Sequence, residues 1–367
     1  MKIALIYFGR RGGGPLYSLE IGKRLSQKAE VLAFISKEIT NFKNWQESGL
    51  HLFAVSTYKN IGCFFFSFLN LPKFLALKRR LKKFSPDVIY YPFFHPWFLI
   101  INLFSQKIPK VFTVHDPFLH KGEKNFILQK IQDAVIKKAA RVIVLSRASQ
   151  EAVFKKGVPT DKIDIIPHGP FDYYQKVGET LSHTVKKEPT ILFFGRILEY
   201  KGLEVLLRAF PLIKKQLPET KLLIVGEGDF RRYCRFLSHL RDVEIVNRWI
   251  NDEEVSHYFS RADLLVCPYL DASQSGVIPL AYFHHLPVVA SRVGGLEEQV
   301  VHGLTGLLVK PGEPAKLAGA CLEILKDNRR KEQMGENGYL KAVEEWNWQS
   351  LSDKVMESLK KAINQSE

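Results

Sequence analysis

Two cations stand where a diphosphate could bind. Arg196 and Lys201 follow a short apolar run in the segment FFGRILEYKG, residues 193–202, and a helical pattern begins directly after them. In open α/β sheets the carboxyl ends of the strands form the ligand crevice, and a guanidinium beside an ammonium suits a diphosphate leaving group. Surface cations are usually only solvated, but the flanking Gly195 and Gly202 favour the diphosphate site.

Other glycine-containing loops also follow predicted strands. The loop SQSGV, residues 273–277, places backbone N–H groups at a helix start, so Ser275, Gly276 and Val277 are predicted to form a phosphate cradle. The segment VGEGD, residues 225–229, brings Gly226 to the end of another strand. The first strand ends in GRRGGGP, residues 9–15, which lacks G-x-G-x-x-G spacing, so a ligand loop and an ordinary turn both stay open there.

Short apolar runs alternate with helical periodicity along the chain, as is typical of parallel sheets covered by helices. We predict two Rossmann-like domains, residues 1–180 and 181–346, because this pattern fades between Pro167 and Pro189. A last helix over 347–367 is predicted to cross back onto the first domain. The predicted strands lie near residues 2–8, 30–36, 51–55, 87–92, 110–115, 141–146 and 162–167, and then near 190–194, 221–225, 243–246, 263–268, 287–290 and 306–309.

Length and composition agree with two domains in a reducing compartment. The chain has 367 residues, 46% of them hydrophobic, and its four cysteines form no C-x-x-C pair, so we expect small core residues and no zinc site. Residues 2–8 run straight into the glycine loop and predict a strand instead of a signal peptide. No apolar run approaches the roughly 20 residues of a membrane span. We expect a cytoplasmic protein, at most peripheral on the inner face of the membrane.

The positive charge lies in the first half of the chain. The net charge is +15, and residues 1–180 hold 28 Lys and Arg against 13 Asp and Glu, whereas residues 181–367 hold 25 of each. The first domain is therefore predicted to face an anionic partner, such as lipid headgroups or an acidic glycan. A nucleic-acid-binding protein would show a recognition motif, and a nicotinamide oxidoreductase would show G-x-G-x-x-G; the chain has neither.

Residues 190–327 resemble the donor domain of the GT4 (group 1) glycosyltransferases of the GT-B fold. The matching pieces are FGR followed by YKG, then VGEG, ADLLVCP, LPVVA and VGGLEE, in the family's order and spacing. The N-terminal half is similar more loosely, through Gly12–Gly14, TVHD at 113–116, VLS at 144–146 and IPHG at 166–169.

The resemblance implies two Rossmann-like domains facing across a cleft, with the nucleotide sugar bound by the second and the acceptor by the first. It implies transfer with retention, without a metal or any cofactor beyond the UDP- or GDP-linked sugar itself. By position, Arg196 and Lys201 hold the diphosphate and His115 touches the donor sugar, so these three are the predicted catalytic residues. The predicted donor-binding residues are Gly13, Gly14, Gly195, Gly226, Trp249, Ile250, Ser275, Gly276 and Val277.

One departure from the family is large. Members usually carry two glutamates eight positions apart before the LPVVA strand, and those places hold Ala272 and Leu280 here. Either Ser273, Gln274 and Ser275 take over, or the donor differs, or the chain is a catalytically impaired scaffold; we favour the first. No Asp-x-Asp occurs, so a metal site is not expected.

The first half of the chain also contains a basic segment with an amphipathic helical pattern. Residues 48–86 contain no acid, and on a helix over 73–84 Phe74, Leu77, Leu81 and Phe84 share one face. This is typical of a membrane-surface helix, but equally of a Rossmann helix packed on its sheet. We predict a hexosyltransferase acting on a lipid-linked or glycan acceptor, in cell-surface polysaccharide or glycolipid synthesis. The predicted membrane or acceptor surface comprises Lys73, Lys78, Arg79, Arg80, Lys82 and Lys83.

Overall fold

The computed structural model describes residues 1–58, 67–68, 70–118, 120, 126–170 and 188–365. Its contacts divide the chain into two compact units. Unit 1 comprises the described residues of Met1–Leu119, Lys124–Pro167 and Trp348–Glu367, and unit 2 comprises His120 and the described residues of His168–Asn347. The predicted boundary near residue 180 lies outside the described residues.

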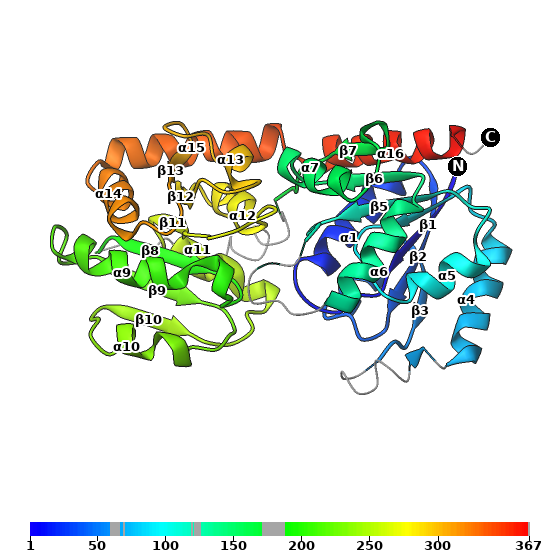
Figure 1. Ribbon diagram of the computed structural model, residues 1–367, viewed down its shortest axis with the longest axis horizontal. Coiled ribbons are helices and arrows are strands. Elements are labelled where there is room, and N and C mark those ends of the chain that lie inside the picture. The colour runs from blue at the N-terminus through cyan, green and yellow to red at the C-terminus, as the bar shows by residue number, and fades with distance from the viewer. Residues whose placement is uncertain (59–66, 69, 119, 121–125, 171–187, 366–367) are drawn as a thin grey trace. The chain divides into compact units, whose positions relative to one another are not determined.

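Unit 1 is built on a parallel sheet of seven strands in the order β3-β2-β1-β4-β5-β6-β7 (Figure 1). The first strand shows why these residues form a sheet: Ile3 to Phe8 are all at most 2% exposed, as in a strand covered on both faces. All seven predicted strands are present. They are β1 (Lys2–Tyr7), β2 (Glu30–Ser36), β3 (His51–Val55), β4 (Val88–Tyr91), β5 (Lys110–Val114), β6 (Arg141–Val144) and β7 (Ile163–Ile165).

Helices cover this sheet, and one of them comes from the far end of the chain. Helix α16 (Trp348–Asn364) packs against α1, β4, β5 and β6. Asp164 of β7 fixes it there, because its carboxylate accepts two 2.7 Å hydrogen bonds from Arg141 and one of 2.6 Å from Ser358 of α16. The others are α1 (Gly14–Leu25), α2 (Phe42–Gln46), α4 (Leu71–Phe84), α5 (Phe98–Phe104), α6 (Phe126–Lys137), α7 (Arg147–Lys155) and the 3₁₀ helix η1 (Thr160–Lys162).

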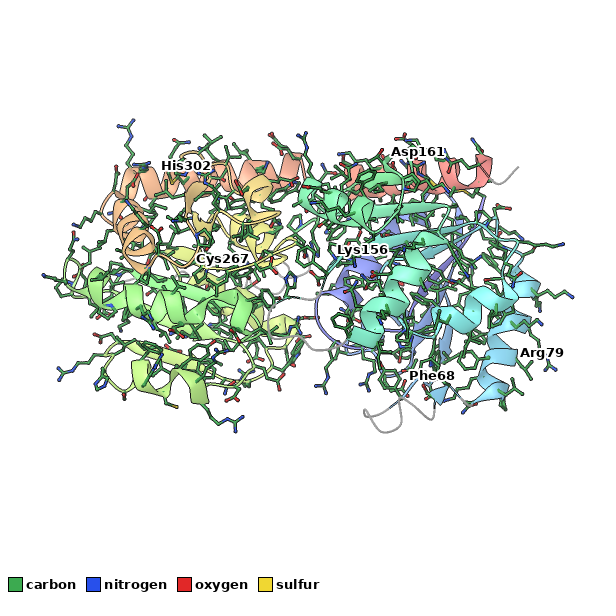
Figure 2. All side chains as sticks on the ribbon, viewed as in Figure 1. Phe68, Arg79, Lys156, Asp161, Cys267 and His302 are labelled. Atoms are coloured by element: carbon green, nitrogen blue, oxygen red, sulfur yellow. The ribbon has the colours of Figure 1, made fainter. Side chains whose placement is uncertain are left out.

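Helix α4 is the basic amphipathic segment, and its apolar face is not free. Phe74, Leu77 and Leu81 are at most 4% exposed in the core of unit 1, and Phe84 packs against that core. The hypothesis that this face enters a bilayer is therefore wrong, because the core of unit 1 already covers it. The charged side remains outside, as Figure 2 shows for Arg79. No helix in the described part of the chain is long and apolar enough to cross a membrane.

Unit 2 is a parallel sheet of six strands in the order β10-β9-β8-β11-β12-β13. The strands predicted there are all present as β8 (Thr190–Phe194), β9 (Lys221–Val225), β10 (Val243–Val246), β11 (Leu264–Cys267), β12 (Val288–Ser291) and β13 (Gly306–Val309). The helices are η2 (Glu199–Lys201), α9 (Leu203–Lys214), η3 (Arg231–Tyr233), α10 (Cys234–Leu237), η4 (Asp252–Glu254), α11 (Val255–Ser260), α12 (Val277–Phe283), α13 (Leu296–Gln299), α14 (Pro314–Leu325) and α15 (Asn328–Glu344).

The cysteine prediction holds for two residues. Cys267, labelled in Figure 2, and Cys321 are free and buried in unit 2. Cys234 is free but exposed, because it begins the short helix α10 at the surface. Cys63 lies outside the described residues.

Candidate functional site

At the carboxyl edge of the unit 2 sheet the loops pack closely against one another. At several positions in these loops the backbone accepts only glycine. Gly195 and Gly226 follow the neighbouring strands β8 and β9, with φ values of +113° and +141°. A Cβ atom on Gly226 would overlap the carbonyl of Gly195. Because the left-handed region and this contact both exclude larger residues, the predicted glycines fix where the loop carrying Arg196 and Lys201 begins.

A third glycine sets the course of that loop. Gly202 has φ +66°, and a Cβ there would overlap the carbonyl oxygen of Pro268, which follows β11. The amide of Leu270 donates to the carbonyl of Tyr200 at 2.6 Å. The 3₁₀ helix η2 therefore packs against the loop that follows β11. This packing places Lys201 beside Tyr269.

Lys201 is at the centre of a polar cluster. Its Nζ donates to Tyr269 Oη at 3.2 Å, and that hydroxyl lies 3.3 Å from Ser275 Oγ. A Cβ atom built on Gly195 would stand 3.0 Å from the same Nζ, so the ammonium lies against the glycine turn. Burial raises the pKa of Tyr269 well above its usual value, which keeps the phenol neutral. The structure thus brings together Gly195, Lys201 and Ser275, as predicted within one site.

The loop before α12 is held rigidly. The Ser275 amide donates to Gln299 Oε1 at 2.8 Å, and Gln299 Nε2 donates back to the Ser275 carbonyl at 2.8 Å. Ser275 Oγ also accepts from the Val277 amide at 3.3 Å. Gly276 therefore starts α12 with its neighbours fixed on both sides, which is the preorganisation that a phosphate cradle needs.

The two positions without glutamate are buried. Ala272 and Leu280 are 2% and 4% exposed, and a Cβ on Gly294 would overlap the Ala272 carbonyl. Beside them, Gln274 Oε1 is buried without a hydrogen-bond partner. A buried acceptor without a partner is uncommon in native proteins and calls for an explanation. Gln274 thus carries a buried acceptor that no described residue satisfies.

The predicted base-binding wall is less open than expected. Trp249 is half-buried, but Ile250 is only 8% exposed and belongs to the interior of unit 2. Arg248 donates to Glu254 in a two-pronged ion pair and to the Trp249 carbonyl at 3.2 Å. Arg196, in contrast, is exposed at the start of its loop, where a ligand can reach it.

Two histidines of unit 2 were missed as site residues. His168 Nδ1 donates to the Gly169 carbonyl at 2.6 Å, and its Nε2 faces Gly276 closely enough that a Cβ there would be 3.8 Å away. Burial lowers its pKa to about 4, so the ring is neutral. His120 stacks on Tyr200 at 4.3 Å and bonds to Asp271 at 3.1 Å. The IPHG segment was the only signal for His168, and no local pattern pointed to His120.

In unit 1 the predicted residues lie at the carboxyl edge of the sheet. His115 follows β5 and donates from Nε2 to the Pro92 carbonyl at 3.0 Å. Its ring stacks on Phe93 at 3.5 Å and meets Tyr17 edge-on at 4.8 Å, and Trp348 of α16 supports Tyr17 at 5.5 Å. The ring is thus held in one orientation, 9% exposed.

The glycine loop of unit 1 leads into α1. Gly13 precedes the helix and its carbonyl accepts from the Tyr17 amide at 2.9 Å. A Cβ on Gly14 would collide with the hydroxyl of Tyr7, so the backbone needs glycine at that place. That His115 and the Gly13–Gly14 loop meet Arg196 and Lys201 around one ligand stays a prediction.

Comparison with known protein families decides the family. The model described as "Glycosyltransferase Family 4" matches residues 11–169, and that described as "Glycosyl transferases group 1" matches residues 188–327. The chain belongs to the group 1 glycosyltransferases. The chain is 29% identical over 239 residues to an uncharacterized glycosyltransferase of Methanocaldococcus jannaschii. This match covers 61% of each of the two chains.

Other relatives have named activities. A GDP-mannose-dependent alpha-(1-6)-phosphatidylinositol monomannoside mannosyltransferase of Mycolicibacterium smegmatis is 30% identical over 213 residues, covering 55% of this chain and 54% of the relative. The match thus spans between half and two thirds of the length of these two relatives.

Solved structures show the fold. The structure of HepE of Anabaena, in complex with UDP and glucose, matches this group 1 chain with a TM-score of 0.78 at 19% sequence identity. The match covers 98% of this chain and 99% of the HepE chain. Sucrose-phosphate synthase of Thermosynechococcus elongatus also gives 0.78, at 22% identity over 99% of both chains. At such identities the likeness concerns the fold alone, and it confirms the predicted GT-B fold class.

Proposed function

We propose that this chain is a retaining, metal-independent hexosyltransferase that moves a sugar from a nucleotide diphosphate sugar to an acceptor. The observation that carries this proposal is the placement of Lys201, held against Gly195 and 3.2 Å from Tyr269 beside the rigid Ser275 loop. The nucleotide is UDP or GDP: solved neighbours contain UDP, and a relative is named for its dependence on GDP-mannose.

Each group has a separate task in this mechanism. Lys201 and Arg196 neutralise the diphosphate as the bond to the sugar breaks, since fixed cations stabilise charge that develops on a leaving group. The N–H group of Gly276 donates to a phosphate oxygen, while the Val277 N–H, which donates to Ser275 Oγ, holds the loop in shape. His115, its ring fixed by Phe93, contacts the donor sugar. With cations and N–H groups in these places, no metal ion is needed to stabilise the leaving diphosphate.

Gln274 is proposed to replace the missing carboxylates. Its Oε1 is buried and unpaired, and it lies two residues from Ala272, where the family usually has glutamate. A sugar hydroxyl that donates to this oxygen would remove the cost of burying an acceptor without a partner. Turnover is then compatible with Ala272 and Leu280, which favours the enzyme over the impaired scaffold.

The acceptor is proposed to be a lipid-linked or glycan molecule of cell-surface polysaccharide or glycolipid synthesis, reached from the cytoplasmic side. The positive excess of the first 180 residues supports an anionic acceptor or surface. On α4, the exposed Lys78, Arg79, Lys82 and Lys83 can still attract anionic headgroups, although the apolar face of the helix is buried.

A ligand screen followed by a transfer assay tests this function. Thermal shifts are measured with UDP, GDP, ADP and their sugars, because a ligand that binds only the folded state raises the melting temperature. The nucleotide sugar that stabilises the protein is then supplied with candidate acceptors, and both nucleotide release and the anomeric configuration of the product are recorded. Stabilisation without transfer or hydrolysis across the panel would favour the impaired scaffold, and no stabilisation by any nucleotide would overturn the proposed donor site.

A further inference from the structure

Unit 1 has a basic hollow at the sheet edge opposite to His115. Its volume is about 550 Å³, and Lys107, Lys110, Lys138 and Lys162 line it. Lys110 is the first residue of β5, Lys107 and Lys138 come shortly before β5 and β6, and Lys162 ends η1 directly before β7. All four therefore lie at the amino ends of these strands. Because Lys110 and His115 are at opposite ends of β5, the hollow is separate from the edge that carries the predicted catalytic residues.

Among the described residues that line this hollow, none carries a negative charge. The remaining lining residues are two glutamines, Ile108, Pro109, Ala139 and Ala140, so no described lining residue is acidic. Within the part of the chain that the structure describes, none of the four lysines forms an ion pair. The nearest acid to Lys162 along the chain is Asp161, which lies exposed at the surface (Figure 2). It is not among the residues that line the hollow. Like charges gathered without counter-charges favour an anion between them.

Lys110 is held in place for such a role. Its Nζ donates to the carbonyls of Ser105 at 2.7 Å and of Ile108 at 2.6 Å, which uses two of its three donors. Burial lowers its pKa to about 8, and an anion nearby would favour the charged form. A fixed ammonium with an uncommitted donor, together with three further lysines around the same hollow, suits an anionic ligand.

We propose that this hollow, the lysine pocket formed by Lys107, Lys110, Lys138 and Lys162, is a second ligand site that binds an anionic phosphate group. The ligand is a soluble phosphorylated compound or the headgroup of an anionic phospholipid; both present the same chemistry. The pocket does not depend on the proposed transfer reaction, because its residues belong to the other edge of the sheet.

Pyrophosphate titration tests the pocket. The full-length protein carries Arg196→Gln and Lys201→Gln throughout, so that the probe cannot bind at the proposed donor site. In this background, Lys107→Gln with Lys138→Gln removes two exposed lining cations without touching the core. Lys37→Gln with Lys137→Gln is the matched control, since these lysines are exposed in the same unit, outside the lining and outside the basic surface of α4.

The expected result is about tenfold weaker binding in the pocket variant, with affinity falling as salt is added, and unchanged binding in the control. A flotation assay with phosphatidylglycerol vesicles identifies the source of the phosphate. Loss of vesicle binding in the pocket variant but not in the control indicates a lipid headgroup, and pyrophosphate binding alone indicates a soluble ligand. If the pocket and control variants match the background protein in both assays, the pocket is not a phosphate site.

Discussion

The Nζ atom of Lys201 lies 3.2 Å from the hydroxyl oxygen of Tyr269 and against the backbone of Gly195. Tyr269 connects this ammonium to Ser275, whose backbone is locked to Gln299 by two hydrogen bonds of 2.8 Å. A diphosphate that reaches the loop before α12 would therefore meet a cation that is already in position. Fixing a cation before the reaction means that no reorganisation is needed as charge develops.

Replacement of either cation should abolish most transfer. We expect Lys201→Ala and Arg196→Ala each to lower kcat about 10²-fold, because each removes a charge from the leaving diphosphate. The measurement is nucleotide release under saturating donor. Lys316→Ala, an exposed lysine of α14, is the control and should be unchanged. Turnover at the wild-type rate in both site variants would mean that these cations do not act on the leaving group.

Gln274 should affect recognition of the donor sugar. We expect Gln274→Leu to weaken transfer about tenfold, because a hydroxyl of the bound sugar loses its acceptor. Gln274→Glu should retain activity, since it keeps an oxygen in the same place. The comparison is made as kcat/KM with the intact nucleotide sugar, while binding of the free nucleotide serves as the control. Equal losses for nucleotide and nucleotide sugar would place Gln274 away from the sugar.

Asp164 should fix the C-terminal helix to unit 1. Asp164→Ala leaves the Arg141 guanidinium, with a side chain 6% exposed, without its carboxylate partner, and we expect a loss of about 3 kcal/mol. Hydrogen exchange of α16 amides reports this locally. Asp353→Ala removes a well-exposed ion pair with Lys28 from the same helix, and we expect less than about 1 kcal/mol. Similar exchange in both variants would contradict the role given to Asp164.

The same carboxylate predicts a pH dependence. Although burial alone would raise the pKa of Asp164, hydrogen bonds from Arg141 and Ser358 outweigh it, and the pKa is lowered. A lowered pKa in the folded state stabilises the protein above the unfolded value, about 3.9, and this contribution is lost as pH falls below it. Protection of α16 should therefore drop below about pH 4 in the wild type and change less in Asp164→Asn.

The basic side of α4 should bind anionic membranes if the acceptor is lipid-linked. Attraction of roughly 1 kcal/mol per cation predicts strong vesicle binding at low salt and weak binding at high salt. Replacing Lys78, Arg79, Lys82 and Lys83 with Gln should abolish it and leave nucleotide binding intact. If the wild-type protein does not bind anionic vesicles at low salt, we would infer that the basic side of α4 binds a soluble acidic acceptor instead.

The sequence by itself determined the strands and the types of residue at their ends. All thirteen predicted strands are present. Runs such as Ile3 to Phe8 and Leu222 to Val225 are short, continuously apolar and buried, as in strands of a parallel sheet that is covered on both faces. The glycines that permit the tight loops were also visible, since Gly195 and Gly226 follow strands directly. These features depend on neighbours in the chain, and local pattern is enough to find them.

Which side chains these residues pack against and bond to is visible only in the tertiary structure. The 73–84 pattern is the same for a membrane helix and for a helix on a sheet, and only the packing of Phe74, Leu77 and Leu81 into the core distinguishes the two. Tyr269, Gln299 and His120 join the site through contacts across 24 to 151 positions of sequence. The lysine pocket likewise gathers cations from separate loops. Periodicity describes one element at a time, whereas burial and hydrogen bonding depend on which elements pack together.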